Sequence, residues 1–184
     1  MSKLPYLLLS LVLIVADQIS KWALAEHVIR PAVPDGGAPM GLLAWYLNTP
    51  PQLPYANVEV TSFFNVVMVW NKGISFGLFN HHTDYGPQIL IALALAITLL
   101  FLYFMTRIRV PVQLVAIAMV IGGAIGNVID RVRFGAVADF FDFHVMGWHW
   151  PAFNIADSCI VLGVLVLLIK GLSLEPRVPV SQST

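Results

Sequence analysis

The chain has 184 residues, of which 58% are hydrophobic and 11% carry a charge. Because about 25% of the residues in an average soluble domain are charged, this chain has too few polar side chains to cover a soluble globule. Lysine and arginine balance aspartate and glutamate at ten each, which leaves no basic excess for nucleic acid. The single cysteine, Cys159, excludes an internal disulfide framework. The composition therefore indicates a small integral membrane protein.

The first apolar segment starts at residue 4 and continues past Asp17 to about residue 25. A helix of about 20 residues crosses the hydrocarbon core of a bilayer, so residues 4–25 are predicted to span it. Lys3, the apolar stretch and the Ala-Leu-Ala of residues 23–25 also resemble a cleaved secretory signal. Asp17 and Lys21 favour a retained helix, because they lie one helical turn apart as an ion pair before the supposed cut.

Residues 26–85 have a different character and are expected to lie outside the membrane. Half of the twelve prolines fall between residues 31 and 54, which predicts an irregular loop there. Valines and aromatic residues dominate residues 57–79, and Asn71, Lys72 and Gly73 are typical of a turn. This region is therefore predicted to form short strands or a hairpin in a small extracytoplasmic β-rich cradle.

Three more helices are predicted, at about 86–106, 111–130 and 153–170. Residues 85–106 and 110–129 carry no charge and flank a short turn with Arg107 and Arg109. The positive-inside rule places that turn in the cytoplasm. The expected fold is a mainly α integral membrane protein with four transmembrane helices and both termini cytoplasmic. The whole chain, 1–184, is expected to be a single domain with a disordered cytoplasmic tail at about 172–184.

Carboxylates and amides gather at one depth, where the last two helices meet the outer membrane surface. These residues are Asn127, Asp130, Asp139, Asp142, Asn154 and Asp157. Polar groups are costly in a membrane protein, so such a cluster indicates function. Asn154 follows Pro151 as an expected N-cap, and Asp157 falls in the first turn, where the helix dipole favours a carboxylate. Burial among the phenylalanines of residues 140–143 favours a protonated carboxyl group. Spacing alone leaves open which of the four aspartates reacts.

Five polar segments follow one another along the chain: DQISK at 17–21, NKGISFG at 71–77, NVIDR at 127–131, VADF at 137–140 and FNIAD at 153–157. In this order they resemble the lipoprotein signal peptidases, bacterial membrane aspartyl peptidases that remove signal peptides from prolipoproteins. The resemblance implies a catalytic pair at Asp139 and Asp157. It also implies supporting or substrate-binding roles for Asp17, Lys21, Asn71, Gly73, Asn127, Asp130, Arg131 and Asn154. The Pro-rich insertion at about 31–54 is longer than the family pattern.

The resemblance further implies an enzyme of the bacterial inner membrane whose active site faces the extracytoplasmic side. Its partners would be prolipoproteins with a lipidated cysteine and membrane lipid, and the enzyme is expected to be a monomer. The expected mechanism has two aspartates sharing one proton, because two like charges cannot both ionise cheaply at close range. One aspartate then activates water and the other polarises the scissile carbonyl, so no metal, cofactor or covalent intermediate is required.

Three other functions remain open from the residues alone. His144 and His149 follow Asp139 and Asp142, and such residues are ligands for a metal-dependent membrane hydrolase. These histidines, with Trp148 and Trp150, are explained more simply as an interfacial aromatic belt. A proton-coupled transporter also uses intramembrane acids, but transport sites lie near the midplane of repeated halves, and this chain shows no repeat. A purely structural subunit would leave the gathered acids without a purpose.

Overall fold

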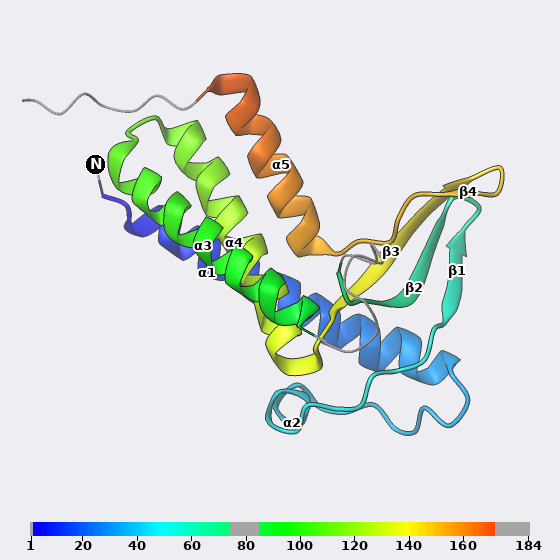
Figure 1. The fold of residues 1–184 in the computed structure, drawn as a ribbon. Helices are drawn as coiled ribbons and strands as arrows, with labels where there is room; N and C mark the ends of the chain where they lie inside the picture. Colours follow the sequence, from blue (N-terminus) through cyan, green and yellow to red (C-terminus); the bar gives the residue numbers. More distant parts are fainter. Residues whose placement is uncertain (1, 74–84, 172–184) are drawn as a thin grey trace, which may run out of the picture.

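A computed structural model describes residues 2–73 and 85–171 and consists of a helical bundle and a small antiparallel sheet (Figure 1). Three helices are long and apolar enough to cross a membrane: Leu4–Ala32, Gly86–Arg107 and Pro111–Phe134. The last helix, α5 (Ile155–Lys170), has 16 residues and is shorter than these. By length and composition, three of the four predicted spans are thus found among the described residues.

Helix α4 (Pro111–Phe134) forms the centre of the bundle and packs against α1 (Leu4–Leu24), α3 (Gly86–Arg107) and α5. Glycines on α4 allow this close approach. A Cβ atom on Gly122 would lie 3.0 Å from the Ser10 carbonyl oxygen of α1, and one on Gly123 would lie 2.3 Å from the Ala156 carbonyl oxygen of α5. Close packing of this kind is typical of small residues in membrane helices.

Helix α1 continues beyond the predicted end at residue 25. A π-helical turn, η1 (Ala25–Ile29), and a 3₁₀ turn, η2 (Arg30–Ala32), extend it beneath the sheet. Ala25 and Ile29 are buried there against Met68 and Phe140 of the sheet. An ion pair, in which Arg30 Nη2 lies 2.7 Å from Glu26 Oε1, stabilises the extension. One face of the sheet therefore packs on this helical extension.

The sheet has four strands in the order β1-β2-β3-β4: β1 (Asn57–Thr61), β2 (Phe64–Asn71), β3 (Val137–Val145) and β4 (Trp148–His149). The prediction of strands within 57–79 is confirmed for residues 57–61 and 64–71. The hairpin turn, however, lies at residues 62 and 63, whereas Asn71 ends β2. The predicted strand residues 74–79 and the predicted tail at 172–184 lie outside the described residues.

Three further features differ from the expectations. Helix α4 continues four residues past its predicted end, to Phe134, where Gly135 terminates it at a φ of +70°. The segment that follows, for which no strand was predicted, forms β3 and pairs with β2. The Pro-rich region is also not entirely irregular, because α2 (Leu42–Leu47) forms within it and Trp45 packs on Phe134 with ring centroids 5.6 Å apart.

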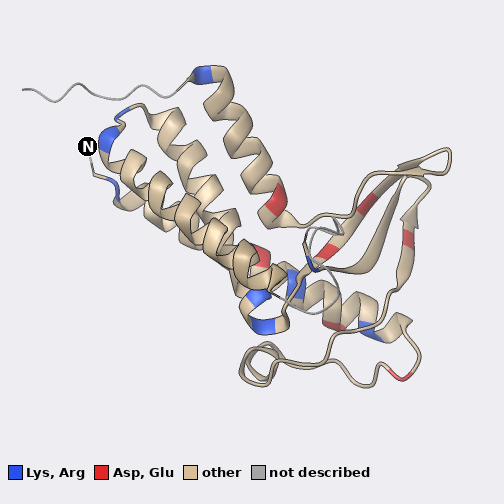
Figure 2. Ribbon diagram, viewed as in Figure 1, with Lys and Arg blue, Asp and Glu red and all other residues tan. Residues whose placement is uncertain are grey.

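Acidic residues are concentrated in the sheet and where the helices meet it, whereas the helix ends on the side of the N-terminus carry basic residues (Figure 2). Between these two levels the described helices are almost free of charge. The structure therefore gathers the polar residues of the sequence at one end of the bundle, beside the sheet.

Candidate functional site

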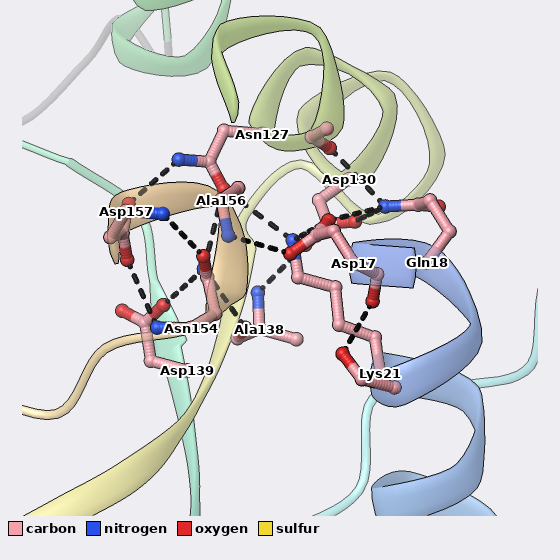
Figure 3. Close-up of polar contacts among 12 residues, drawn as sticks. Asp17, Gln18, Lys21, Asn127, Asp130, Ala138, Asp139, Asn154, Ala156 and Asp157 are labelled. Atoms are coloured by element: carbon pink, nitrogen blue, oxygen red, sulfur yellow. Dashed lines mark hydrogen bonds and ion pairs between the residues drawn. The ribbon is translucent and has the colours of Figure 1, made fainter. Parts of the chain in front are cut away.

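Asp139 and Asp157 approach each other from different elements. Asp139 lies in the middle of β3 and is 1% exposed, and Asp157 lies in the first turn of α5 and is half-buried. Asn154 stands between them (Figure 3): its Nδ2 donates to Asp139 Oδ1 at 2.8 Å, and its Oδ1 accepts from the Asp157 backbone N–H at 2.9 Å. Asn154 therefore contacts both aspartates: its side chain bonds the Asp139 carboxylate and the Asp157 backbone, and its backbone N–H bonds the Asp157 carboxylate.

Local sequence explains how Asp157 is placed. Asn154 has an extended backbone and caps α5, and the Asp157 carboxylate in turn accepts from the Asn154 backbone N–H at 3.2 Å. This reciprocal pair is a capping box, which satisfies N–H groups that a helix start leaves unpaired. The predicted N-cap and its helix-start carboxylate are confirmed. Asn127 completes the contacts by donating from Nδ2 to Asp157 Oδ1 at 2.7 Å.

Asp139 receives a second amide from the end of β2. Asn71 Nδ2 donates to Asp139 Oδ2 at 3.1 Å, while Asn71 Oδ1 accepts the Gly73 backbone N–H at 2.9 Å. Gly73 has a φ of +92°, which side chains disfavour, and a Cβ atom there would lie 2.1 Å from Leu90 Cδ1. The glycine therefore permits a turn that orients the Asn71 amide toward the carboxylate.

Burial and the neighbouring Asp157 charge raise the pKa of Asp139 from 3.8 to about 7. Hydrogen bonds from Asn71 and Asn154 favour the charged form and oppose this shift. A carboxyl group in this state holds a proton near neutral pH and exchanges it readily, as general acid–base chemistry requires.

A second acidic cluster lies directly behind the first. Lys21 Nζ lies 2.8 Å from Asp17 Oδ2 and 2.8 Å from Asp130 Oδ2, and all three side chains are 1% exposed. Gln18 Nε2 bonds the same pair, at 2.8 Å from Asp130 Oδ1 and 3.2 Å from Asp17 Oδ2. The predicted ion pair of Asp17 and Lys21 is confirmed, and Asp130 is added to it. Gln18 belongs to this network although sequence reasoning did not single it out.

This Lys21 network also binds the backbone next to Asp139 and Asp157. Asp17 Oδ1 accepts the Ala156 N–H at 2.9 Å, and Asp130 Oδ2 accepts the Ala138 N–H at 3.1 Å (Figure 3). Ala156 and Ala138 immediately precede Asp157 and Asp139. The network therefore fixes both chain segments that carry the paired carboxylates.

Not every candidate joins this site. Arg131 Nη1 bonds the Asn127 carbonyl oxygen at 3.4 Å, beside the pair. Asp142 lies three residues beyond Asp139 on β3, where side chains alternate between faces, and so points to the opposite face. There its Oδ2 lies 2.8 Å from His149 Nδ1 and 3.1 Å from Asn65 Nδ2. Among residues 2–73 and 85–171, no group of three or more His, Cys, Asp or Glu side chains is arranged to hold a metal ion.

Comparisons with known proteins match this arrangement. The family model for signal peptidase (SPase) II matches residues 9–173. The chain belongs to the signal peptidase II family. The lipoprotein signal peptidase of Burkholderia vietnamiensis is 36% identical over 169 residues, which cover 91% of this chain and 87% of the relative. The lipoprotein signal peptidase of Sphingopyxis alaskensis is 39% identical over 135 residues, covering 72% and 78%.

The fold is also similar to that of a solved bacterial membrane enzyme, determined by the in meso method at 1.9 Å resolution. That structure shares 25% sequence identity, covers 90% of this chain and 91% of its own, and superposes with a TM-score of 0.66. Membership of the signal peptidase II family makes the chain a membrane protease, as the order of its polar segments predicted.

Proposed function

We propose that this chain removes signal peptides from diacylglyceryl-modified prolipoproteins by cutting before the lipidated cysteine, and that Asp139 and Asp157 perform the hydrolysis. The observation that carries this proposal is that Asn154 binds both carboxylates, Asp139 through its side-chain amide and Asp157 through its backbone N–H, at the end of an apolar bundle. The relatives' activity as lipoprotein signal peptidases supports the substrate, and the raised pKa of Asp139 supports the aspartyl mechanism.

In this mechanism the two aspartates share one proton. Burial of Asp139 favours its protonated form, so in this mechanism Asp157 is the carboxylate that acts as the base. Asp157 accepts a proton from water as the water oxygen attacks the scissile carbonyl carbon, and Asp139 donates a hydrogen bond to the carbonyl oxygen. A proton then passes to the leaving amine as the C–N bond breaks, which returns the pair to one shared proton.

The groove beside the pair suits the substrate. It has a volume of about 240 Å³ and lies between α3, α4 and α5, with apolar walls that include Leu93, Ile97 and Ile160. Asn127 and Arg131 also line it, next to Asp157. An apolar signal-peptide helix placed in this groove would bring its polar end to the carboxylates.

The proposed membrane arrangement has four spans with both termini in the cytoplasm and the aspartate pair facing the extracytoplasmic side. The N-terminus, the turn between α3 and α4, and the end of α5 all lie at the same end of the bundle (Figure 1). At about 1.5 Å per residue the 16 residues of α5 reach about 24 Å, so this helix would cross with help from its flanking residues. We propose one catalytic domain acting as a monomer in the bacterial inner membrane, in contact with its lipid.

The direct test is cleavage of a diacylglyceryl-modified precursor in detergent, with EDTA present. Asp139→Asn and Asp157→Asn should each lose at least about a hundredfold in kcat, because each removes an acid or base from the reaction. Asp142→Asn is the matched control, since it makes the same change three residues along the same strand, and it should retain wild-type turnover.

Each outcome has a distinct meaning. Activity retained by a folded Asp139→Asn or Asp157→Asn variant would remove that residue from the chemistry. Reversible loss of wild-type cleavage in EDTA would favour the metal-dependent hydrolase, and no cleavage by wild type at all would refute the peptidase assignment. Folding of each variant is checked by its thermal unfolding temperature in the same detergent.

A further inference from the structure

The face of the sheet that carries Asp139 continues away from the site as a row of apolar side chains. Successive residues of a strand point to opposite faces, so Asp139, Phe141, Phe143 and Val145 share one face of β3. The opposite face, with Phe140, is packed on the extension of α1. The Asp139 face is exposed toward the far end of β3, at Phe143 and Val145, whereas Phe141 packs partly against the core.

Strand pairing brings further aromatic rings to this face. Trp148 pairs with Val145, and Phe153 bridges to Phe141, so each lies on the same side as its partner. The Trp150 backbone N–H donates to the Phe143 carbonyl oxygen at 2.8 Å. The Phe143 and Phe153 rings stack with centroids 6.0 Å apart, and the Trp148 and Trp150 rings meet edge to face at 5.8 Å. We call this surface the aromatic face: Phe141, Phe143, Val145, Trp148, Trp150 and Phe153.

A groove of about 420 Å³ runs over this surface, lined by Phe63, by His144 and by every member of the aromatic face except Phe141. Phe143, Trp148 and Trp150 are 44%, 58% and 55% exposed. Ligand pockets occupy about 300–1,000 Å³, and exposed apolar patches of this kind mark binding sites. The groove therefore has the size and surface for an apolar ligand.

Residues that line the groove are close in sequence to residues of the aspartate site. Phe153 immediately precedes Asn154, which bonds Asp139. Phe143 lies four residues beyond Asp139, or roughly 13 Å along an extended strand. A group attached to the substrate residue at the scissile bond can therefore reach the aromatic face while the bond lies at the carboxylates.

We propose that the aromatic face binds an acyl chain of the diacylglyceryl group on the substrate cysteine. This inference rests on the proposed function, which places that cysteine next to the scissile bond. An acyl chain needs no hydrogen-bonding partner, and each methylene that is fully buried tightens binding about fourfold. The aromatic face would then recognise the acyl chain, while the groove between α3, α4 and α5 binds the signal peptide.

The test compares two precursors with the same peptide, one carrying two long acyl chains and one carrying two short chains, in detergent without a bilayer. Wild type should show a higher kcat/KM for the long-chain precursor. The double variant Trp148→Ala/Trp150→Ala should reduce that ratio about tenfold or more, mainly through KM. Leu43→Ala/Leu47→Ala, which shortens two exposed apolar side chains of α2, should keep the wild-type ratio.

A binding measurement covers a variant that folds poorly or turns over too slowly. A precursor with brominated acyl chains should quench tryptophan fluorescence in the Asp157→Asn enzyme, and removal of Trp148 and Trp150 from that enzyme should abolish most of the quenching. Equal losses on both precursors, or unchanged quenching, would overturn the acyl-chain assignment. A loss seen only in bilayers and independent of chain length would show that the aromatic face contacts bulk lipid instead. Absence of wild-type cleavage would refute the proposed function itself.

Discussion

Two neighbouring clusters of acidic side chains in this protein differ in the groups to which they are hydrogen-bonded. Asp17 and Asp130 share the Lys21 ammonium, whereas Asp139 and Asp157 are bonded by amide and backbone N–H groups. A lysine ties two carboxylates together by ion pairing, whereas the neutral donors around Asp139 leave its pKa raised to about 7. The first cluster is therefore suited to holding structure and the second to chemistry.

The two clusters are also connected. Asn127 accepts from Lys21 Nζ at 3.4 Å and donates to Asp157, so it touches both. The Asp17 and Asp130 carboxylates bind the N–H groups of Ala156 and Ala138, one residue before each member of the proposed pair. The contrast predicts that changes in the first cluster alter stability and changes in the second alter turnover.

The largest effect is expected from Lys21→Met. This change leaves Asp17 and Asp130 buried without their cation, and loss of one partner from a buried ion pair costs about 3–5 kcal/mol of unfolding free energy. Chemical unfolding in detergent measures it. Lys170→Met, the same substitution at the exposed end of α5, is the control and should change stability by less than about 0.5 kcal/mol. Equal effects would contradict the structural role of the first cluster.

The pH dependence of stability should isolate the second cluster. An unfolded chain loses the Asp139 proton near pH 3.8 and the folded chain near pH 7, so Asp139 stabilises the fold fully below about pH 4. That contribution declines as pH rises and is gone above about pH 7, with a slope of at most about 1.4 kcal/mol per pH unit.

The measurement is the free energy of unfolding of wild type and Asp139→Asn between pH 4 and 8. The wild-type value should fall relative to the variant over this range. A constant difference between the two proteins would show that Asp139 titrates normally.

Substitutions of Asn154 can distinguish its role in capping α5 from its hydrogen bond to Asp139. Asn154→Ser keeps an oxygen that caps α5 but loses the amide that donates to Asp139, so turnover should fall about tenfold to a hundredfold with stability nearly unchanged. Asn154→Ala removes both and should also cost about 1 kcal/mol of stability. If the serine variant keeps wild-type turnover, the amide is only a cap.

The smallest effect is expected from Gly73→Ala. Its φ of +92° disfavours a side chain, at a cost of about 1–2 kcal/mol, and the added methyl would press on Leu90. The Asn71 amide should turn from Asp139, lowering kcat several-fold. Gly37→Ala, at a φ of +73° in the distant loop, is the control and should leave kcat unchanged. A similar kcat for both variants would show that the turn at Gly73 does not contribute to turnover.

Much of this fold and site was predictable from the order of residues. Uncharged runs predicted α3 and α4, and Asn154 with Asp157 predicted the start of α5. These patterns could be recognised because each depends only on residues of a single helix. The strand β3 was missed because its partner, β2, lies far away in the sequence. The turn at Asn71 was assigned to a hairpin because a turn motif does not reveal which strands it separates.

By itself, the sequence determined which segments are apolar enough for a membrane and the family to which the chain belongs. Only the tertiary structure decided how the acids are grouped. Asp17 and Asp130 are 113 residues apart yet share Lys21, and Asp142 lies only three residues from Asp139 yet points to the other face. Spacing along the chain does not encode these choices, because strand alternation and helix packing set which side chains meet.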